Sequence, residues 1–206
     1  ARKKTGMDCG MMVVNGSIND IKITAVASDF DFLGASMAAA EGEAFLYGIQ
    51  HAIENQNPFL CISAGGGMRM MESLISLSQM SRTSLAINEL KKNNLPYLVC
   101  ITDPTAGGIT ASYAMLGDIH IAEPGALIAF AGARVIQGTV KEELPEGFQK
   151  SEYVEKTGFV DIIIERKNLS EKIGTLLSIL LKKNSAISTE ENETTENTQS
   201  LSKVAS

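Results

Sequence analysis

Two glycine-rich turns contain the residues whose types and spacing could do chemistry. The first turn, residues 64–67 (Ala-Gly-Gly-Gly), follows the apolar segment 59–63, and the second, residues 103–108 (Asp-Pro-Thr-Ala-Gly-Gly), follows the apolar segment 97–102. A strand that ends in glycines before a helix leaves backbone N–H groups without internal partners, and the helix dipole there favours negative charge. Two such turns on neighbouring strands could direct two N–H groups at one oxygen. That arrangement is an oxyanion hole, which suits an enolate formed from a thioester.

Glycines at strand ends also have a purely structural explanation. They serve tight turns and the close packing of helices in many α/β proteins. Neither turn has the spacing of a phosphate-binding loop, because both the Gly-x-x-x-x-Gly-Lys-Ser/Thr pattern and the Gly-x-Gly-x-x-Gly pattern are absent. The turns therefore leave two hypotheses open, an oxyanion site or a packing device.

Arg69 lies just after the first turn, separated from Gly67 only by Met68, and it also has two explanations. It could be a surface arginine that pairs with Glu72, three positions further along. It could instead receive a carboxylate or a phosphate, for which the planar guanidinium group is well shaped. The spacing favours neither.

Other side chains offer weaker candidates. The sequence has only two histidines, His51 and His120, which excludes a histidine-rich metal site, and we predict no metal ligand set. Ser112 follows the second turn as a nucleophile could, but a Ser-His-Asp triad would need one of those two histidines, so we disfavour it. Asp103, which precedes a proline, is expected to be a turn residue.

The three cysteines, Cys9, Cys61 and Cys100, are odd in number and none belongs to a Cys-x-x-Cys pair. This argues against a disulfide framework and favours a reducing cytoplasm. Cys61 and Cys100 lie inside apolar runs, so we expect both to be small core residues.

The hydrophobic pattern predicts short strands that alternate with helices. Asn15-Gly16 is expected to turn the first strand into the second. Such alternation indicates an α/β fold, with a parallel sheet that is covered on its faces. Strands are expected at 11–14, 21–27, 59–63, 97–102, 119–122, 126–130 and 160–165, and helices at 41–55, 68–92, 109–116 and 169–181.

Composition limits the class of protein. A chain of 206 residues with 44% hydrophobic and 20% charged residues suits one globular domain. No apolar run reaches the ~18 residues that a membrane span requires, so we expect no membrane segment. The net charge of −6 does not suggest a broad nucleic-acid surface. The polar, acidic tail at 185–206 is expected to be disordered.

Long motifs surround both turns. Residues 61–72 read Cys-Ile-Ser-Ala-Gly-Gly-Gly-Met-Arg-Met-Met-Glu, and residues 102–118 read Thr-Asp-Pro-Thr-Ala-Gly-Gly-Ile-Thr-Ala-Ser-Tyr-Ala-Met-Leu-Gly-Asp. They resemble Ser-Gly-Gly-Ala-Arg-Met-Gln-Glu and Thr-Asp-Pro-Thr-x-Gly-Gly-Val-x-Ala-Ser-Phe-Ala-x-Leu-Gly-Asp, segments of the β-type carboxyltransferase subunits of bacterial biotin-dependent acetyl-CoA carboxylases. Shorter matches follow in order at 121–124, 130–136 and 144–152. The resemblance runs from about residue 6 to residue 182.

This resemblance implies a crotonase-like (ClpP/crotonase) fold, an α/β ββα superhelix, as a single domain over residues 1–184. It implies transfer of a carboxyl group from carboxybiotin, held on a carrier protein, to acetyl-CoA, which gives malonyl-CoA for fatty acid synthesis. The implied partners are a carboxyltransferase α subunit in an α₂β₂ assembly, the biotin carboxyl carrier protein and biotin carboxylase. The implied location is the cytoplasm.

The resemblance also suggests roles for the turn residues. The matching glycine amides of the family stabilise an enolate, no protein base is needed, and a second oxyanion hole comes from the α subunit. On this basis the catalytic candidates are Gly66, Gly67, Gly107 and Gly108, and the substrate-binding candidates are Arg69, Gly65 and Ala106.

The sequence departs from the family pattern at several positions. Gly65 and Met68 stand where the family commonly has serine and alanine, and Met68 places bulk beside the expected site. Residues 34–38 read Gly-Ala-Ser-Met-Ala where Gly-Gly-Ser-Met-Gly is usual, and Ala133 replaces a common proline. The family's four-cysteine zinc ribbon has no counterpart, since Cys9 alone cannot form one. We therefore expect zinc only in that missing segment and interpret the chain as a fragment.

Two rival functions remain. Another crotonase-superfamily enzyme, such as an enoyl-CoA hydratase, would need a pair of glutamates beside the turns, where only Glu72 is found. A non-catalytic assembly module would use the glycines for packing and exposed apolar residues for association.

Overall fold

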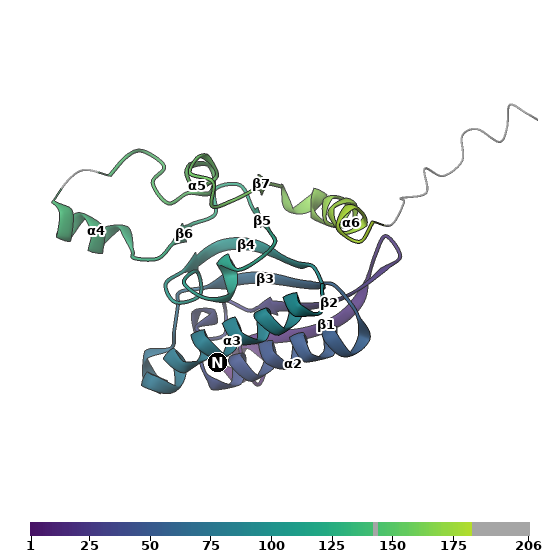
Figure 1. Cartoon of the computed structure of the whole chain (residues 1–206). Coiled ribbons are helices and arrows are strands. Elements are labelled where there is room, and N and C mark those ends of the chain that lie inside the picture. Colours follow the sequence, from purple (N-terminus) through teal and green to yellow (C-terminus); the bar gives the residue numbers. More distant parts are fainter. Residues whose placement is uncertain (142–143, 183–206) are drawn as a thin grey trace, which may run out of the picture.

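A mixed seven-stranded sheet forms the centre of the computed structural model, which describes residues 1–141 and 144–182 (Figure 1). The strand order is β1-β2-β3-β4-β5-β7, and β6 pairs with β4 beside this path. The predicted disordered tail at 185–206 lies outside the described residues. The strands are β1 (Met11–Ile18), β2 (Ile21–Ser28), β3 (Phe59–Gly65), β4 (Tyr97–Ala106), β5 (Ile119–Ala122), β6 (Ile128–Ala129) and β7 (Ile162–Ile163). The α-helices are α1 (Arg2–Thr5), α2 (Ala39–Asn55), α3 (Ser73–Lys92), α4 (Ala133–Val140), α5 (Ser151–Lys156) and α6 (Leu169–Leu180), and the 3₁₀ turns are η1 (Leu33–Ala35), η2 (Met70–Glu72), η3 (Tyr113–Met115) and η4 (Arg166–Asn168).

The first two strands form an antiparallel hairpin, but its turn is not where the sequence suggested. β1 continues through Asn15 and Gly16, which pair with β2, and the chain reverses at Asn19 and Asp20. Both turn residues have left-handed backbone, with φ of 48° and 61°. Asparagine and aspartate tolerate this conformation, which a two-residue hairpin turn requires. The prediction of an Asn15-Gly16 turn is therefore wrong.

Two strand–helix–strand units follow and build the parallel part of the sheet. α2 connects β2 to β3, and α3 connects β3 to β4, with each strand pair parallel. Parallel neighbours require such crossovers because one strand must return to the same edge before the next begins. The carboxyl ends of β3 and β4, and with them the two glycine turns, consequently lie at the same edge of the sheet.

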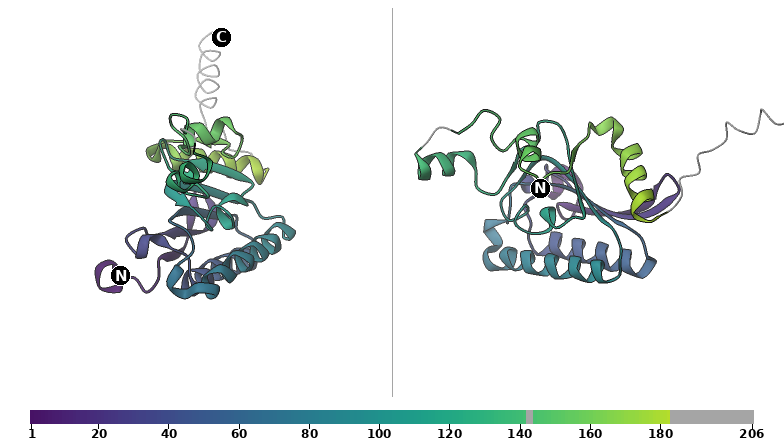
Figure 2. Two further views of the ribbon diagram at one scale, coloured as in Figure 1. Left: turned by 90° about the vertical axis from the view of Figure 1, so that its left-hand side faces the viewer. Right: turned by 45° about the horizontal axis from the view of Figure 1, so that its top comes forward.

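Helices cover both faces of the sheet, as the alternating pattern predicted. Figures 1 and 2 show α2 and α3 side by side on one face and α6 on the other. The core under α2 and α3 includes Phe45, Ile49, Phe59 and Tyr97, all buried. The core under α6 joins Ile173 and Leu177 to residues of β2 to β5. The sheet is thus apolar on both sides, which explains why its central strands read as continuous apolar runs.

Both helices predicted to follow the glycine turns are wrong in detail. α3 begins at Ser73 rather than at residue 68, because the backbone of Arg69 is extended and donates to the Met37 carbonyl at 2.8 Å, and η2 comes between. After the second turn, the predicted helix at 109–116 is reduced to hydrogen-bonded turns and η3. The argument from a helix dipole at each turn therefore loses its basis.

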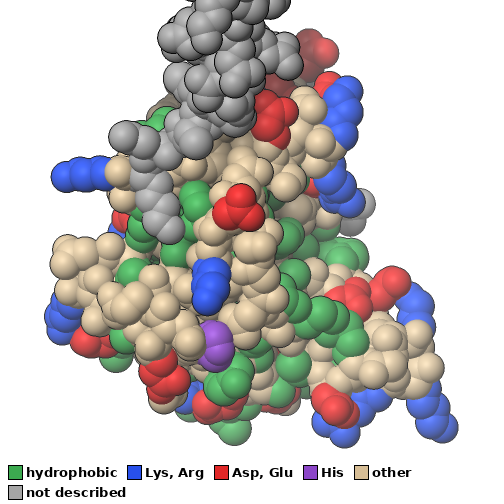
Figure 3. All heavy atoms as spheres, turned by 90° about the vertical axis from the view of Figure 1, so that its right-hand side faces the viewer, with side chains coloured by type: hydrophobic (Ala, Val, Ile, Leu, Met, Phe, Trp, Pro, Cys, Tyr) green, Lys and Arg blue, Asp and Glu red, His purple; other side chains and the backbone are tan. Residues whose placement is uncertain are grey.

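No helix among the described residues is long and apolar enough to cross a membrane. On the face drawn in Figure 3, lysine and arginine side chains are spread among acidic ones rather than gathered into one basic patch.

Candidate active site

The two glycine turns touch each other. A Cβ atom added to Gly107 would lie 3.2 Å from both the Gly66 oxygen and the Gly67 Cα, and one added to Gly67 would lie 3.5 Å from the Gly108 nitrogen. The φ angles of Gly67 and Gly107, 122° and 65°, fall in the region that L side chains rarely adopt. Both the backbone conformation and the close approach therefore require glycine at these positions.

The hydrogen bonds divide the four candidate glycines into two pairs. Gly66 N–H donates to the Gly34 carbonyl at 3.1 Å, and Gly107 N–H donates to the Ala129 carbonyl at 3.0 Å. The N–H groups of Gly67 and Gly108 have no acceptor among the described residues. Buried or half-buried amides are normally paired, so two adjacent free ones are the natural donors to a ligand oxygen.

Gly65 and Ala106 lie at the last positions of β3 and β4. A Cβ atom on Gly65 would approach the Ala35 carbonyl oxygen and the Ile109 side chain to 2.5 Å. Serine, common in the family at this position, therefore cannot fit without movement of the loop that contains Ala35. Gly65 shapes the turn from within the sheet, whereas Ala106 is half-buried beside Gly107.

Arg69 is buried rather than exposed, and its guanidinium group is engaged by the protein. It donates to Glu41 at 2.7 Å, to Glu72 at 3.1 Å, and to the Ser36 hydroxyl and carbonyl at 3.1 and 2.8 Å. Burial alone would lower the pKa of Arg69, but the hydrogen bonds and charges of Glu41 and Glu72 outweigh it and raise this pKa. The predicted Glu72 partner is confirmed, and the contacts favour an anchoring role for Arg69 over substrate recognition.

Glu41 is a central residue of the site that the sequence did not single out. Its carboxylate also accepts the N–H groups of Gly10 at 2.9 Å and of Ala38 at 3.1 Å. Glu41 therefore connects three segments: Gly10 before β1, Ala38 at the start of α2, and Arg69 after the first turn. Glu41 was recognisable only as a helix-starting residue, because its burial depends on segments far away in the sequence.

The second turn is held by hydroxyl groups. Thr110 Oγ1 lies 2.7 Å from the Gly107 carbonyl and 2.8 Å from the Ala129 carbonyl, and Ser112 Oγ donates to the Gly108 carbonyl at 2.6 Å. Ser112 is buried and engaged with the backbone, so it is not an exposed nucleophile. Among the described residues, its hydroxyl bonds the Gly108 and Ile109 carbonyls and neither histidine.

Met68 lies against the second turn, as its position in the sequence suggested. A methyl group on Gly108 would meet Met68 Cγ at 2.6 Å and Cε at 3.0 Å, and Met80 Sδ at 3.2 Å. The side chains of Met68 and Met80 thus cover Gly108 on the side where a Cβ atom would point.

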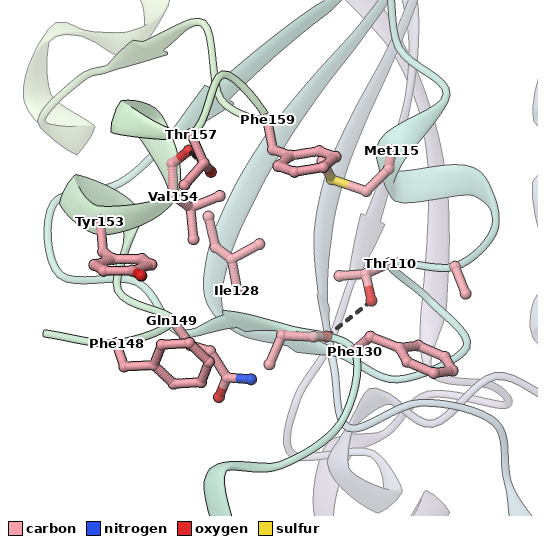
Figure 4. Close-up of a pocket in the computed structure, with 12 residues that line it drawn as sticks. Thr110, Met115, Ile128, Phe130, Phe148, Gln149, Tyr153, Val154, Thr157 and Phe159 are labelled. Atoms are coloured by element: carbon pink, nitrogen blue, oxygen red, sulfur yellow. Dashed lines mark hydrogen bonds between the residues drawn. The ribbon is translucent and has the colours of Figure 1, made fainter. Parts of the chain in front are cut away.

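An apolar pocket of about 420 Å³ borders the second turn (Figure 4). Figure 4 shows Thr110 at its edge, hydrogen-bonded to the backbone of β6, with Phe130, Phe148 and Phe159 around the opening. Three of the polar side chains that line the pocket donate to backbone carbonyls: Thr110 to Ala129 at 2.8 Å, Gln149 to Ala131 at 2.7 Å and Thr157 to Val154 at 2.7 Å. The chemistry of the pocket suits apolar groups rather than phosphates. The lining residues are Thr110, Ala111, Met115, Ile128, Ala129, Phe130, Phe148, Gln149, Tyr153, Val154, Thr157 and Phe159.

Comparison with known proteins places this geometry in a family. Residues 1–202 match the model of the carboxyl transferase domain. The chain is 80% identical over its whole length to the acetyl-coenzyme A carboxylase carboxyl transferase subunit beta of Pelagibacter ubique strain HTCC1062, of which it covers 67%. It is 52% identical over 88% of its length to the subunit of the same name from Caulobacter vibrioides strain NA1000 / CB15N, of which it covers 59%. The chain thus spans about three fifths to two thirds of these relatives.

Solved structures agree with the fold. Transcarboxylase 12S, with methylmalonyl-coenzyme A and methylmalonic acid bound, matches 82% of this chain with a TM-score of 0.74 and 25% identity, and the match covers 33% of that chain. The Pseudomonas malonate decarboxylase MdcD-MdcE hetero-dimer matches 95% of this chain and 86% of its own, with a TM-score of 0.74 and 18% identity. The predicted crotonase-like α/β fold is confirmed.

Proposed function

Because the chain belongs to the carboxyl transferase domain family, we propose that it provides the thioester-binding half of a carboxyltransferase site. The reaction moves a carboxyl group from carboxybiotin to acetyl-CoA and gives malonyl-CoA, as in fatty acid synthesis. One observation supports it above the others: the free N–H groups of Gly67 and Gly108 belong to turns in van der Waals contact. Two donors at one oxygen stabilise the negative charge that develops there, and loss of one donor typically lowers the rate ~100- to 1,000-fold.

The free amides act on the acyl group of the substrate. The thioester oxygen accepts from Gly67 and Gly108, so that the charge of the enolate develops between two fixed dipoles. Gly66 and Gly107 contribute by shape, because their own N–H groups are already bonded. Arg69 keeps the first turn in place through Glu41 and Ser36.

The surroundings of Glu72 favour carboxyl transfer over hydration. One carboxylate oxygen accepts from Arg69 at 3.1 Å and the other from the Ala39 N–H at 3.2 Å. A glutamate held in this way is poorly placed to activate water. Carboxyl transfer needs no base from this chain, since the biotin group supplies both the carboxyl group and the acceptor for the methyl proton.

We infer that the rest of the site comes from a carboxyltransferase α subunit in an α₂β₂ assembly, which acts with the biotin carboxyl carrier protein and biotin carboxylase. Apolar side chains beside the first turn support a protein partner: Met70 and Met71 are 91% and 77% exposed, and Leu74 and Ile75 continue the patch. Exposed apolar patches of this kind mark interaction sites. A purely structural assembly module would share this patch but would not need two free amides.

The proposed function also implies where zinc is bound and where in the cell the protein acts. No group of three or more histidine, cysteine or acidic residues in the described part of the chain could hold a metal ion. We assign the family's zinc to the cysteine ribbon that this sequence does not contain. The unpaired Cys9, Cys61 and Cys100 fit a reducing compartment, the cytoplasm.

The direct test is decarboxylation of malonyl-CoA with free biotin as the carboxyl acceptor, using this chain mixed with a matching α subunit. Gly107→Val is compared with Gly125→Val. Both glycines have left-handed backbone, with φ of 65° and 69°, but only Gly107 has neighbours within 4 Å. Both variants therefore carry the same backbone strain, and only Gly107→Val pushes the turns apart.

We expect the wild-type mixture to be active, Gly107→Val to lose activity while still associating, and Gly125→Val to retain it. No activity from an associated wild-type complex would contradict the proposal and favour the assembly module. Equal losses in both variants would show that the contact between the turns is not needed for the reaction.

A further inference from the structure

The segment Thr102–Thr105 has no part in the chemistry proposed above, yet it leads directly into the second glycine turn. Along it, β4 contains extra residues: Ser63 lies opposite Ile101 and Gly65 opposite Thr105, so the register shifts between these pairs. A bulge of this kind bends a strand and re-aims the residues that follow it. The offset of one glycine turn from the other is therefore set by this bulge.

Two hydroxyl groups close the bulge onto β3. Thr102 Oγ1 donates to the Ser63 carbonyl at 2.8 Å. Thr105 Oγ1 lies 2.9 Å from the same carbonyl and 2.9 Å from the Thr102 carbonyl. Thr105 and Ser63 are completely buried, so water cannot replace these bonds. These two hydroxyl groups connect β4 to β3 where the bulge interrupts the regular backbone hydrogen bonds between the strands.

The same segment also holds β6 in place, and a carbonyl of β6 accepts the N–H group of one of the turn glycines, Gly107. The Asp103 carboxylate accepts the Leu127 N–H at 2.7 Å, and the Thr105 N–H donates to the Leu127 carbonyl at 2.9 Å. β6 ends at Ala129, whose carbonyl accepts the Gly107 N–H. The bulge therefore joins β3, β4 and β6 at the point where both turns begin. Asp103 belongs to the strand, which corrects its predicted place in a turn.

We propose that Thr105 is a positioning residue for carboxyl transfer. Its buried hydroxyl holds the bulge of β4 against Ser63, so that the free N–H groups of Gly67 and Gly108 meet at one oxygen atom. This inference rests on the proposed function, because Thr105 would position the two N–H groups that the proposed reaction uses. A donor displaced by a fraction of an ångström weakens transition-state binding more than substrate binding, since the charge develops only in the transition state.

The test uses Thr105→Val, which keeps the shape and removes the hydroxyl, and Thr105→Ser, which keeps the hydroxyl. Thr83→Val is the matched control, because Thr83 is equally buried and, among the described residues, its hydroxyl bonds only within α3, to the carbonyls of Gln79 at 2.9 Å and Met80 at 3.1 Å, and not to either turn. Each variant is assayed with its α subunit for malonyl-CoA decarboxylation with biotin, and kcat and KM are determined separately. Thermal unfolding of each variant measures its stability.

We expect Thr105→Val to lower kcat ~10- to 100-fold, with KM for malonyl-CoA changed much less. Thr105→Ser should restore most of kcat, and Thr83→Val should leave kcat unchanged despite a comparable loss of stability. Thr102→Val removes the other hydroxyl and should lower kcat in the same sense, which keeps the inference testable if Thr105→Val does not fold.

A Thr105→Val complex with wild-type kcat would overturn the inference while leaving the proposed function intact. A loss shared equally by Thr83→Val would overturn it too, because stability alone would then explain the effect. Inactivity of the wild-type complex would instead remove the proposed function, and this inference with it.

Discussion

Arg69 Nη2 donates to Glu41 Oε1 at 2.7 Å inside the protein, where the two side chains are only 8% and 2% exposed. Two charges held away from water attract each other strongly, but each becomes costly when its partner is removed. Because Arg69 follows the first glycine turn and Glu41 lies in the first turn of α2, this pair connects the glycine turn to that helix. The stability of the turn should therefore depend on both charges.

Glu41→Gln should lower the free energy of unfolding by about 3–5 kcal/mol, since it leaves the Arg69 charge buried without its main partner. Glu43→Gln is the control, because Glu43 also lies on α2 and pairs with Arg82 at 2.7 Å, but is 66% exposed. Glu43→Gln should lower the free energy of unfolding by less than about 1 kcal/mol, the usual contribution of an exposed ion pair. Chemical denaturation of both variants measures the difference, and equal losses would show that the buried pair contributes no more than a surface one.

The strands and the two crossovers could be predicted because each signal is local. Apolar runs at 59–63 and 97–102 stand between clear breakers, and an apolar run of that length can only be a buried strand or part of a buried helix. The glycines after them showed where the strands end. The family resemblance added the fold, which the order of elements alone did not specify.

The details of the site could not be predicted because they depend on contacts between distant segments. The Gly66 N–H donates to the Gly34 carbonyl, and the Gly107 N–H donates to the Ala129 carbonyl. Both acceptors are distant in the sequence, so the sequence could not show which glycine N–H groups remain free. The start of α3 at Ser73 likewise follows from a backbone contact between Arg69 and Met37. Helix propensity favours residues 68–72 as helix, and the tertiary contact overrides it.

Gly108 and Met68 should be coupled energetically. Gly108 does not have left-handed backbone, so an alanine there is limited only by space. Its Cβ would meet the flexible side chains of Met68 and Met80. Gly108→Ala should lower the free energy of unfolding by about 1–3 kcal/mol through overpacking, and part of this loss should disappear when Met68→Ala is added.

Gly16→Ala provides the control for this cycle. No atom lies within 4 Å of a Cβ at Gly16, so its effect should add to that of Met68→Ala without coupling. Urea unfolding of the single and double variants gives the coupling energy. A coupling of zero between Gly108→Ala and Met68→Ala would mean that Met68 does not restrict the second turn.

His120 should make the protein less stable in mild acid. Burial lowers the pKa of His120 below its usual 6.5, and the charge of Lys91 adds to this shift, whereas Asp161, 3.6 Å away, and Asp118 oppose it. The neutral ring accepts the Gly117 N–H at 3.2 Å, a bond that protonation would remove. Between the lowered pKa and 6.5 the unfolded chain binds more protons than the folded one, so stability rises with pH in this window and falls as the pH falls.

Thermal unfolding across this pH window, in wild type and in His120→Gln, measures the effect. The variant should lose the histidine contribution to the pH dependence, while His51→Gln, in the other histidine position, should retain it. If His120→Gln shows the full wild-type pH dependence, another group is responsible.

Only one of the three cysteines should react with a thiol reagent in the folded protein. Burial raises the pKa of Cys100 to about 12 and also raises that of Cys61, so neither forms the reactive thiolate at mildly alkaline pH. Cys9 is half-buried and lies near the surface, with its Sγ 3.1 Å from the Met11 carbonyl. Spectrophotometric titration with an aromatic disulfide should count one fast thiol in the native chain and three after unfolding. Cys9→Ser should abolish the fast reaction, and rapid labelling of that variant would show that β3 or β4 opens far more often than their complete burial implies.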